Sequence, residues 1–178
     1  MQTTRTNDFR EIITGRNSIK NYDTSVKISR EEMTEILTEA TLAPSSINLQ
    51  PWRFVVIESA EAKATLAPLA RFNQNQVETS AAVIAVFGDL NNFDKAEEIY
   101  GKAVELGYMP LETKEMQLPR LSAHFATLDP QVNKETVLLD GGLVSMQLML
   151  VARAHGYDTN PIGGFEKDQI AEAFGLDK

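Results

Sequence analysis

The chain contains no cysteine, and this absence excludes several classes of site at once. Disulfide-stapled folds, thiolate metal sites and cysteine nucleophiles all depend on that residue. Basic residues are also scarce, because 17 lysines and arginines stand against 25 aspartates and glutamates and leave a net charge of -8. Nucleic acids and anionic membranes select basic surfaces, so we expect neither of them as a partner.

Long apolar runs are scarce as well. The longest uncharged, largely apolar stretch extends from Gly141 to Ala152, whereas a membrane-spanning helix needs about 20 residues. The first residues include Arg5, Asp8, Arg10 and Glu11 and lack the apolar segment of a secretory signal. We therefore expect a cytoplasmic protein. With only two histidines and no acidic pair at metal-ligand spacing, we predict no metal site.

What remains is the composition of an ordinary globular protein. Hydrophobic residues make up 43% of the 178 residues and charged residues 24%. This length is sufficient for one domain with a sizeable core and short for two. We therefore predict a single domain over residues 1–178.

The segment Pro44–Trp52 is the first candidate for a binding site. Its two bracketing prolines enclose four side chains that can form hydrogen bonds: Ser45, Ser46, Asn48 and Gln50. Pro44 disfavours helical geometry at Ala43, so the preceding helix should end there, and the apolar strand 54–57 follows. Polar loops between rigid elements often bind ligands, although a solvated turn would have the same composition.

Two further segments have a composition suited to a ligand. If Arg16-Asn17-Ser18-Ile19-Lys20 is extended, Arg16, Ser18 and Lys20 point to one side and suit a phosphate, because charged hydrogen bonds are strong. An exposed basic turn is the alternative. Later, Pro161-Ile162-Gly163-Gly164-Phe165 contains two glycines that would let the backbone approach a flat ligand closely.

The spacing of apolar residues predicts a helix after Ser29 and another over residues 136–155, but it is irregular between residues 108 and 130. Ser29 followed by Glu32 is a capping-box match before apolar positions at Met33, Ile36, Leu37, Ala40 and Ala43. The span 136–155 predicts a helix that is apolar all round, which must be buried on every side and which we expect to face partly a partner subunit. Between residues 108 and 130, three prolines interrupt the pattern; Phe125 there either stacks on a bound aromatic group or closes the core.

The motif Pro-Ser-Ser-x-Asn-x-Gln-Pro-Trp resembles the nitroreductase family of FMN-dependent NAD(P)H oxidoreductases. The segment 16–20 before it and the segment 161–165 after it also resemble family motifs, and the three occur in the family's order. The resemblance covers nearly the whole chain. It implies an α+β fold with a mainly antiparallel central sheet wrapped by helices, and a homodimer with non-covalent FMN at the subunit interface. The implied reaction passes electrons from NADH or NADPH through FMN to a small acceptor, such as a nitroaromatic or a quinone, by a ping-pong mechanism.

The resemblance also assigns roles to individual residues. It implies that Arg16 and Ser18 hold the FMN phosphate, and that Lys20 stabilises the reduced flavin. It implies that the backbone N–H of Gly163 donates to the flavin nitrogen that receives hydride, so Gly163 and Lys20 are the predicted catalytic residues. Amides near residue 73 read the imide edge of the flavin, or else begin a polar helix. The predicted cofactor-binding residues are Arg16, Asn17, Ser18, Lys20, Pro44, Ser45, Ser46, Asn48, Asn73, Gln74, Pro161, Ile162, Gly163 and Gly164.

The chain departs from the family pattern in two respects. Many relatives carry glutamate at the position of Gly163, and a glycine keeps the backbone donor while it removes the carboxylate. Family members also continue into one more strand and a tail that crosses to the partner, whereas this sequence ends at Lys178, so we expect the C-terminal strand to be lacking. The alternative functions are therefore a non-catalytic FMN-binding or storage module, and a helical interaction domain without a ligand.

Overall fold

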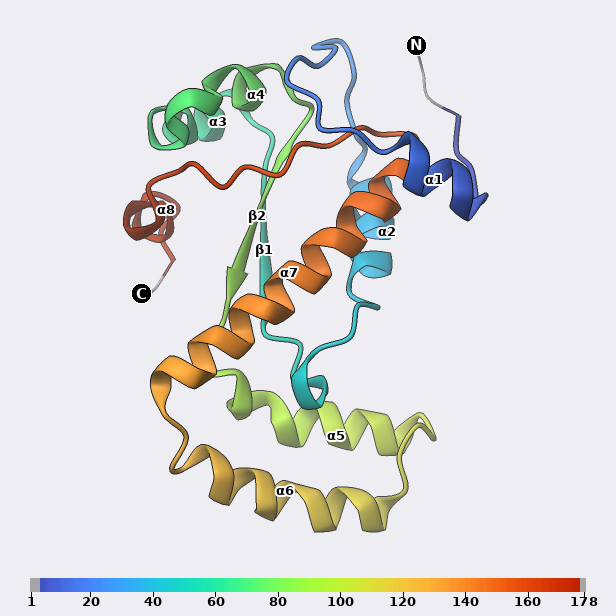
Figure 1. The fold of residues 1–178 in the computed structure, drawn as a ribbon, viewed down its shortest axis with the longest axis vertical. Coiled ribbons are helices and arrows are strands. Elements are labelled where there is room, and N and C mark those ends of the chain that lie inside the picture. Colours follow the sequence, from blue (N-terminus) through green and yellow to red (C-terminus); the bar gives the residue numbers. More distant parts are fainter. Residues whose placement is uncertain (1–3, 177–178) are drawn as a thin grey trace. The chain divides into compact units, whose positions relative to one another are not determined.

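The computed structural model describes residues 4–176 and shows an α+β fold (Figure 1). Its helices and strands are α1 (Phe9–Gly15), α2 (Arg30–Ala40), β1 (Trp52–Ile57), α3 (Ala60–Leu66), α4 (Gln74–Thr79), β2 (Val83–Gly88), α5 (Ala96–Glu105), α6 (Leu111–Phe125), α7 (Pro130–Ala154) and α8 (Lys167–Ala173). Short 3-10 helices lie at Ser46–Asn48 (η1), Ala67–Asn73 (η2) and Asn92–Lys95 (η3). β1 and β2 pair as a small antiparallel sheet, which confirms the predicted fold class.

The chain forms two compact units. Unit 1 contains the residues up to 40, residues 54–85 and the residues from 146 onward, whereas unit 2 contains residues 41–53 and 86–145. The two strands and α7 each contribute residues to both units. The organisation as a single domain therefore stays a prediction.

The core of unit 1 forms where α2 packs on the last turns of α7. Ile36 and Ala40 of α2 are buried against Leu148 of α7, and Ile84 of β2 joins them. α2 begins as its sequence predicts, because the Ser29 hydroxyl accepts a hydrogen bond from the Glu32 N–H at 3.1 Å. This bond satisfies one of the backbone donors that a helix start leaves open.

Unit 2 contains a regular helix where the sequence pattern breaks. α6 packs against α5 and holds Pro119 in its interior. None of its residues is buried, so its apolar side chains need not follow the spacing of a core face. The ring of Phe125 stacks on Phe93 of η3 with 4.7 Å between their centroids. Phe125 therefore has an aromatic partner within its own unit.

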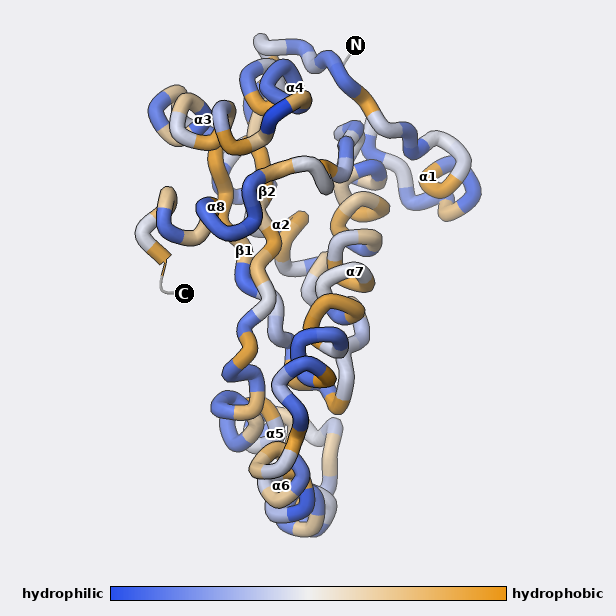
Figure 2. The backbone as a smooth tube through the Cα atoms, turned by 60° about the vertical axis from the view of Figure 1, so that its left-hand side comes forward, coloured by the Kyte–Doolittle hydropathy of each residue, from blue (hydrophilic) through white to orange (hydrophobic). Residues whose placement is uncertain are grey.

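α7 is the longest helix, with 25 residues, and hydrophobic residues recur along it (Figure 2). Val137, Val144 and Leu148 are buried. Other apolar side chains of the same helix remain exposed, with fractions of 66% for Leu138 and 72% for Leu139. By length and composition alone α7 could cross a membrane, a criterion that core helices of soluble proteins also meet. The prediction of burial on every side is therefore not met within one chain.

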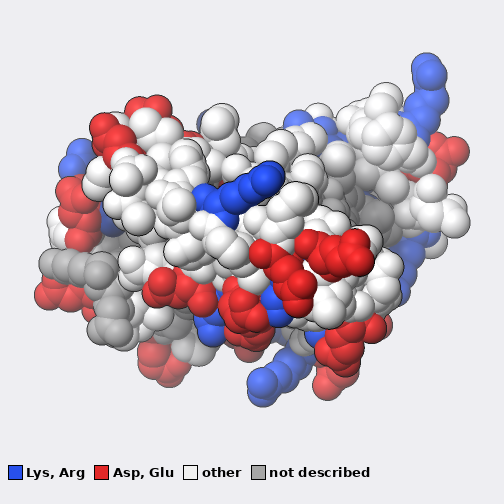
Figure 3. Space-filling view, turned by 90° about the horizontal axis from the view of Figure 1, so that it is seen from below, with Lys and Arg blue, Asp and Glu red and all other residues white. Residues whose placement is uncertain are grey.

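The surface shows the scarcity of basic residues that the composition predicts. On the face drawn in Figure 3, acidic and basic side chains of the described residues are interspersed and do not form a continuous basic surface. Several arginines and lysines of the described residues have acidic partners, as in the pairs Arg53–Asp89 and Lys102–Glu105. Such exposed pairs contribute little to stability.

Candidate functional site

The predicted segment 16–20 lies in unit 1 beside residues 159–164, which include the predicted residues 161–164. Ser18 forms a parallel bridge with Thr159, and the N–H of Ile19 donates to the Thr159 carbonyl at 3.1 Å. Arg16 has extended backbone angles directly after α1. The segment is therefore extended at Arg16 and Ser18, whereas Lys20 lies at a bend. In Figure 1 the chain that follows α7 passes beside the chain that follows α1.

Both cations of this segment have no partner of opposite charge. Arg16 is half-buried and Lys20 is exposed, and among residues 4–176 neither of them forms an ion pair. Asn17 instead turns its amide nitrogen to the Gly15 carbonyl at 2.9 Å. Two unpaired positive charges next to the end of α1 are available for an anionic ligand.

The amide cluster of residues 73–76 connects the other two segments. The Asn73 side chain donates to the Gly164 carbonyl at 3.2 Å, and the Asn75 side chain donates to the Lys20 carbonyl at 2.6 Å. The structure therefore brings the segments 16–20, 73–76 and 159–164 together. Gln74, which the sequence analysis named, is the first residue of α4.

Sequence reasoning missed the structural role of Asn75 and of Gln76. Gln76 is only 6% exposed, and its amide nitrogen donates to the Asn73 side-chain oxygen at 3.1 Å. Asn73 and Gln76 are three residues apart, which is the spacing of neighbours on one helix face and a signal that the sequence contains. The cluster of amides is therefore both a polar helix start and a connection between candidate binding segments.

The glycine pair of the last segment has two different environments. A Cβ added to Gly163 would meet no atom within 4 Å, whereas a Cβ at Gly164 would lie 3.4 Å from the Asn73 amide nitrogen. Neither residue has a positive φ. Glycine is therefore not required here by backbone conformation. It keeps the space in front of Gly163 open and lets Gly164 approach Asn73.

The predicted residues Pro44, Ser45, Ser46 and Asn48 form a separate group in unit 2. Ile47, Asn48 and Gln50 have φ angles of 45°, 57° and 49°, which is the left-handed region that side chains other than glycine rarely adopt. Such conformations persist only where surrounding contacts hold them, and they are common at binding sites.

Two residues from distant parts of unit 2 hold this loop. Asp140 of α7 accepts a hydrogen bond from the Ser46 N–H at 3.0 Å, and the Tyr100 hydroxyl donates to the Ile47 carbonyl at 3.1 Å. Asp140 is 3% exposed, and its second carboxylate oxygen has no partner among the described residues. Burial raises the pKa of Asp140, and the Ser46 N–H lowers it to a smaller extent. An acidic residue inside the most apolar helix was the sequence signal for this contact.

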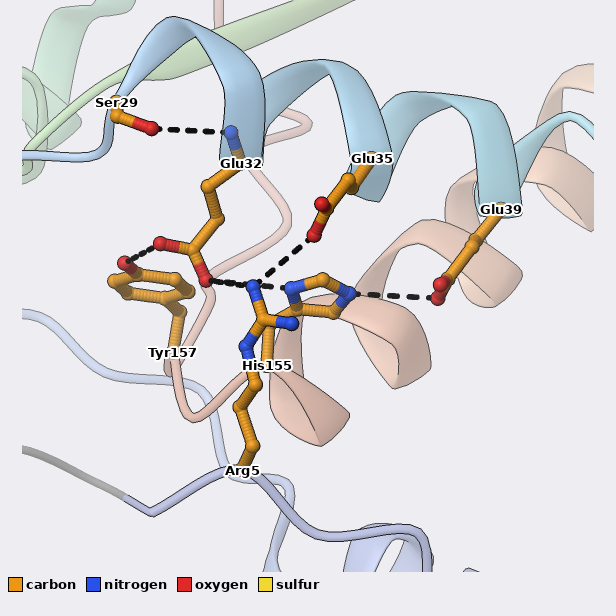
Figure 4. A network of polar contacts seen from close by, with 7 residues as sticks. All are labelled: Arg5, Ser29, Glu32, Glu35, Glu39, His155 and Tyr157. Atoms are coloured by element: carbon orange, nitrogen blue, oxygen red, sulfur yellow. Dashed lines mark hydrogen bonds and ion pairs between the residues drawn. The ribbon is translucent and has the colours of Figure 1, made fainter.

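A second polar network in unit 1 surrounds His155 (Figure 4). Its ring nitrogens lie 3.3 Å from Glu32 and 3.4 Å from Glu39, both on α2. Glu32 also accepts from Arg5 and Tyr157, each at 2.8 Å. Burial opposes the ionisation of Glu32, but the hydrogen bonds from Arg5, Tyr157 and His155 prevail and lower its pKa.

The position of this network indicates a structural role. It joins the N-terminal segment, α2 and the end of α7, from which the chain continues to Thr159. The part of the chain from residue 4 to 176 contains no group of three His, Asp or Glu side chains suited to hold a metal ion, and the absence of a metal site stays a prediction.

Comparison with known proteins identifies relatives over nearly the full chain. A model of the nitroreductase family matches residues 13–178. A Bacillus subtilis protein, YdgI, whose name places it among NAD(P)H nitroreductases, is 71% identical over 98% of this chain and 83% of its own length. An enone reductase of CLA biosynthesis from Lactiplantibacillus plantarum is 34% identical over 96% of this chain and 79% of its own length.

A solved structure from Exiguobacterium sibiricum, described as a nitroreductase in complex with FMN, has the same fold. Its TM-score is 0.96 at 65% sequence identity, and the match covers 99% of this chain and 84% of that one.

Proposed function

The chain belongs to the nitroreductase family, and from this premise we propose that it is an FMN-dependent oxidoreductase that takes electrons from NAD(P)H. A protein 65% identical to it was solved in complex with FMN, which supports the same cofactor here. When bound, FMN supplies the redox chemistry, because it can accept a hydride and release electrons to an acceptor. The protein contributes binding, orientation and electrostatics.

One observation supports this proposal most directly: three candidate segments of unit 1 are joined by hydrogen bonds around unpaired cations and an open backbone. The residues present fit FMN. Arg16 and Ser18 would hold the phosphate, because arginine forms strong charged hydrogen bonds with phosphate oxygens. Asn17, whose amide nitrogen donates to the Gly15 carbonyl, would line the site between them. The open space in front of Gly163 suits a flat ring system, with Pro161, Ile162 and Gly164 alongside.

The two proposed catalytic groups act by electrostatics. The backbone N–H of Gly163 would donate a hydrogen bond to the flavin nitrogen that accepts hydride, and the Lys20 ammonium would stabilise the negative charge that reduction leaves on the flavin. Donors that are already oriented toward developing charge lower a barrier without reorganisation. Asn73 and Gln74 would read the imide edge; Asn73 retains one amide hydrogen beyond the one donated to Gly164.

We propose ping-pong kinetics, since the nicotinamide and the acceptor would occupy the same open space in turn. The acceptor class is a small molecule such as a nitroaromatic, a quinone or an enone. The enone is supported by the 34% identical relative that is named as an enone reductase.

We further propose that the protein is a cytoplasmic homodimer with FMN between subunits. The exposed apolar face of α7 supports this, because its side chains Leu138, Leu139 and Leu143 are between 47% and 72% exposed. Apolar surfaces of this kind mark sites of association. In such a dimer, Ser45, Ser46 and Asn48 would reach the flavin of the other subunit.

The experiment that tests the function is a spectrum of the purified protein before and after addition of NADH or NADPH. We expect a yellow protein whose flavin absorbance falls on anaerobic addition of one of the nucleotides and returns with an electron acceptor. A yellow protein that neither nucleotide bleaches would indicate the FMN storage module. A colourless protein that does not bind added FMN would indicate the interaction domain and contradict the proposal.

A further inference from the structure

The segment from Thr159 to Glu166 is held at both ends and open in the middle. Thr159 is bridged to Ser18 at one end. At the other end, the N–H of Glu166 donates to the Leu69 carbonyl at 2.9 Å. Between these anchors, Gly163 faces space without any atom within 4 Å of a built Cβ.

The second anchor includes an ion pair that the proposed reaction does not use. The Glu166 carboxylate pairs with the Arg71 guanidinium, and the side chains are 28% and 62% exposed. Arg71 has a φ of 38° and a ψ of -113°, a conformation that side chains other than glycine rarely adopt. Such a conformation persists where contacts over-determine it, and it occurs most often at functional sites.

A neutral hydrogen bond supports the same part of the segment. The buried Gln76 side chain donates to the Asn73 oxygen, so the Asn73 amide nitrogen is turned toward the Gly164 carbonyl. Gly164 and Glu166 are therefore both fixed to the stretch 69–73. Gly163 lies one residue from the first of these fixed points.

We propose that the Arg71–Glu166 ion pair positions the backbone N–H of Gly163 for the flavin, which makes Arg71 and Glu166 positioning residues of the reaction. This inference rests on the proposed function, because FMN is the group toward which the N–H is held. Two consecutive glycines have the largest conformational freedom of any dipeptide, and no side chain of their own can restrain them. The restraint must come from their neighbours.

Loss of the Arg71–Glu166 pair should affect the position of the segment near Gly163 rather than the stability of the whole protein. A partly exposed ion pair contributes little to the free energy of unfolding. A hydrogen-bond donor that must meet developing charge loses much of its effect when it is displaced by an ångström or less. Loss of the pair should therefore slow flavin reduction while the protein remains folded and continues to bind FMN.

The test compares Glu166→Gln, Arg71→Gln and the double variant with the parental protein. Each single change removes one charge of the same pair, so flavin reduction in the double variant should be no slower than in either single variant. Arg71→Lys keeps the positive charge and should retain most of the parental rate. Glu98→Gln is the matched control, because it removes an exposed ion pair with Lys95 in unit 2.

Three measurements are made on each protein. In the protein without FMN, the backbone N–H of position 166 should exchange its hydrogen roughly two- to tenfold faster in the Glu166→Gln and Arg71→Gln variants than in the parental protein. With FMN, the dissociation constant should change by less than about threefold, since the pair does not touch the phosphate side. Single-turnover reduction by the preferred nucleotide should slow by about tenfold or more.

The outcomes separate this inference from the function on which it rests. If the parental protein is not reduced by either nucleotide, the proposed function is wrong and the positioning role with it. If the parental protein is reduced and the Glu166→Gln and Arg71→Gln variants are reduced equally fast, only the positioning role is wrong. The positioning role is also wrong if the control Glu98→Gln slows flavin reduction as much as Glu166→Gln and Arg71→Gln do.

Discussion

At the scale of residues, Arg16 is the side chain proposed to bind the phosphate of FMN. Arg16 combines three properties: it is half-buried, it lacks an acidic partner among the described residues, and its segment is bridged to Thr159. A guanidinium in this position has its hydrogen bonds available. The first two predictions concern such local effects in unit 1.

We expect Arg16→Ala to weaken FMN binding by about tenfold or more, because a hydrogen bond to a charged group is worth about 1.5–3 kcal/mol. Riboflavin, which lacks the phosphate, should bind with nearly unchanged affinity. Fluorescence titration of the protein without cofactor measures both dissociation constants. Arg10→Ala is the control, since Arg10 is an exposed arginine of α1. Equal losses for FMN and riboflavin would refute the phosphate assignment.

The two glycines should respond differently to side chains. Gly163→Glu enters open space and should preserve FMN binding and flavin reduction. Gly164→Val would press a branched side chain against the Asn73 amide, which lies 3.4 Å from a built Cβ. We expect flavin reduction to slow by about tenfold in that variant, because its donor segment is displaced. A Gly164→Val protein reduced at the parental rate would show that the segment is only a structural turn.

Asp140 provides a test of buried charge in unit 2. Burial raises its folded-state pKa above the unfolded value, so the ionised carboxylate costs stability. The stability of the parental protein should therefore decrease as the pH rises through that folded-state pKa. Asp140→Asn keeps an oxygen for the Ser46 N–H and removes the charge.

We expect the Asp140→Asn variant to be more stable than the parent at neutral pH. The advantage should shrink as the pH falls toward the ordinary aspartate pKa of about 3.9, where the parental carboxyl is also neutral. Urea unfolding at several pH values measures the difference. Asp94→Asn, at an exposed position of η3, should show no such pH-dependent advantage. A difference independent of pH would contradict the assignment to buried charge.

At the scale of elements, α7 is a helix whose apolar surface is only partly buried by its own chain. It is apolar on all sides, but a single chain buries only part of it, as the exposure of Leu138 and Leu139 shows. Replacing an exposed leucine costs little within one chain, whereas a charge in a subunit interface is costly because it must lose its water. A substitution on this face therefore distinguishes a solvated face from an interface.

We expect Leu139→Glu to convert a dimer into a folded monomer. Sedimentation velocity measures the assembly state, and circular dichroism shows whether the helices are retained. Leu106→Glu is the matched control, because Leu106 is also an exposed leucine, with 53% of its surface accessible, at the end of α5. A parental protein that sediments as a monomer, or a Leu139→Glu variant that stays a dimer, would refute the proposed interface.

At the scale of the whole molecule, the proposal assigns residues of both units to one chemistry. The loop residue Asn48 has a φ of 57°, so Asn48→Gly removes its amide without backbone strain. If Asn48 serves the flavin of the partner, mixing Asn48→Gly with Arg16→Ala chains should restore one intact site in each mixed dimer. Activity of the mixture after demonstrated chain exchange is the measurement. Activity that stays at the level of the separate variants would show that the loop serves its own subunit.

Local physical chemistry was sufficient to predict several elements from sequence. The Ser29–Glu32 capping box, the apolar spacing of α2 and the strand 54–57, which became β1, all depend on neighbours within a few residues. The break between residues 108 and 130 was interpreted less well, because α6 forms with a proline inside it and without a buried face. Its regularity depends on packing against α5, which the local pattern does not contain.

The sequence by itself determined which residue types were available for the candidate site: two cations close together, consecutive amides, a glycine pair, and no thiol. Only the tertiary structure decided which of them meet. Asn73 reaches Gly164 across 91 residues, Asp140 reaches Ser46 across 94, and Arg71 reaches Glu166 across 95. Contacts between residues so far apart depend on how the helices and loops pack, and not on any local preference of the chain. The physical reason is that a hydrogen bond needs its two atoms within about 3 Å, a condition that only the folded chain can satisfy at such separations.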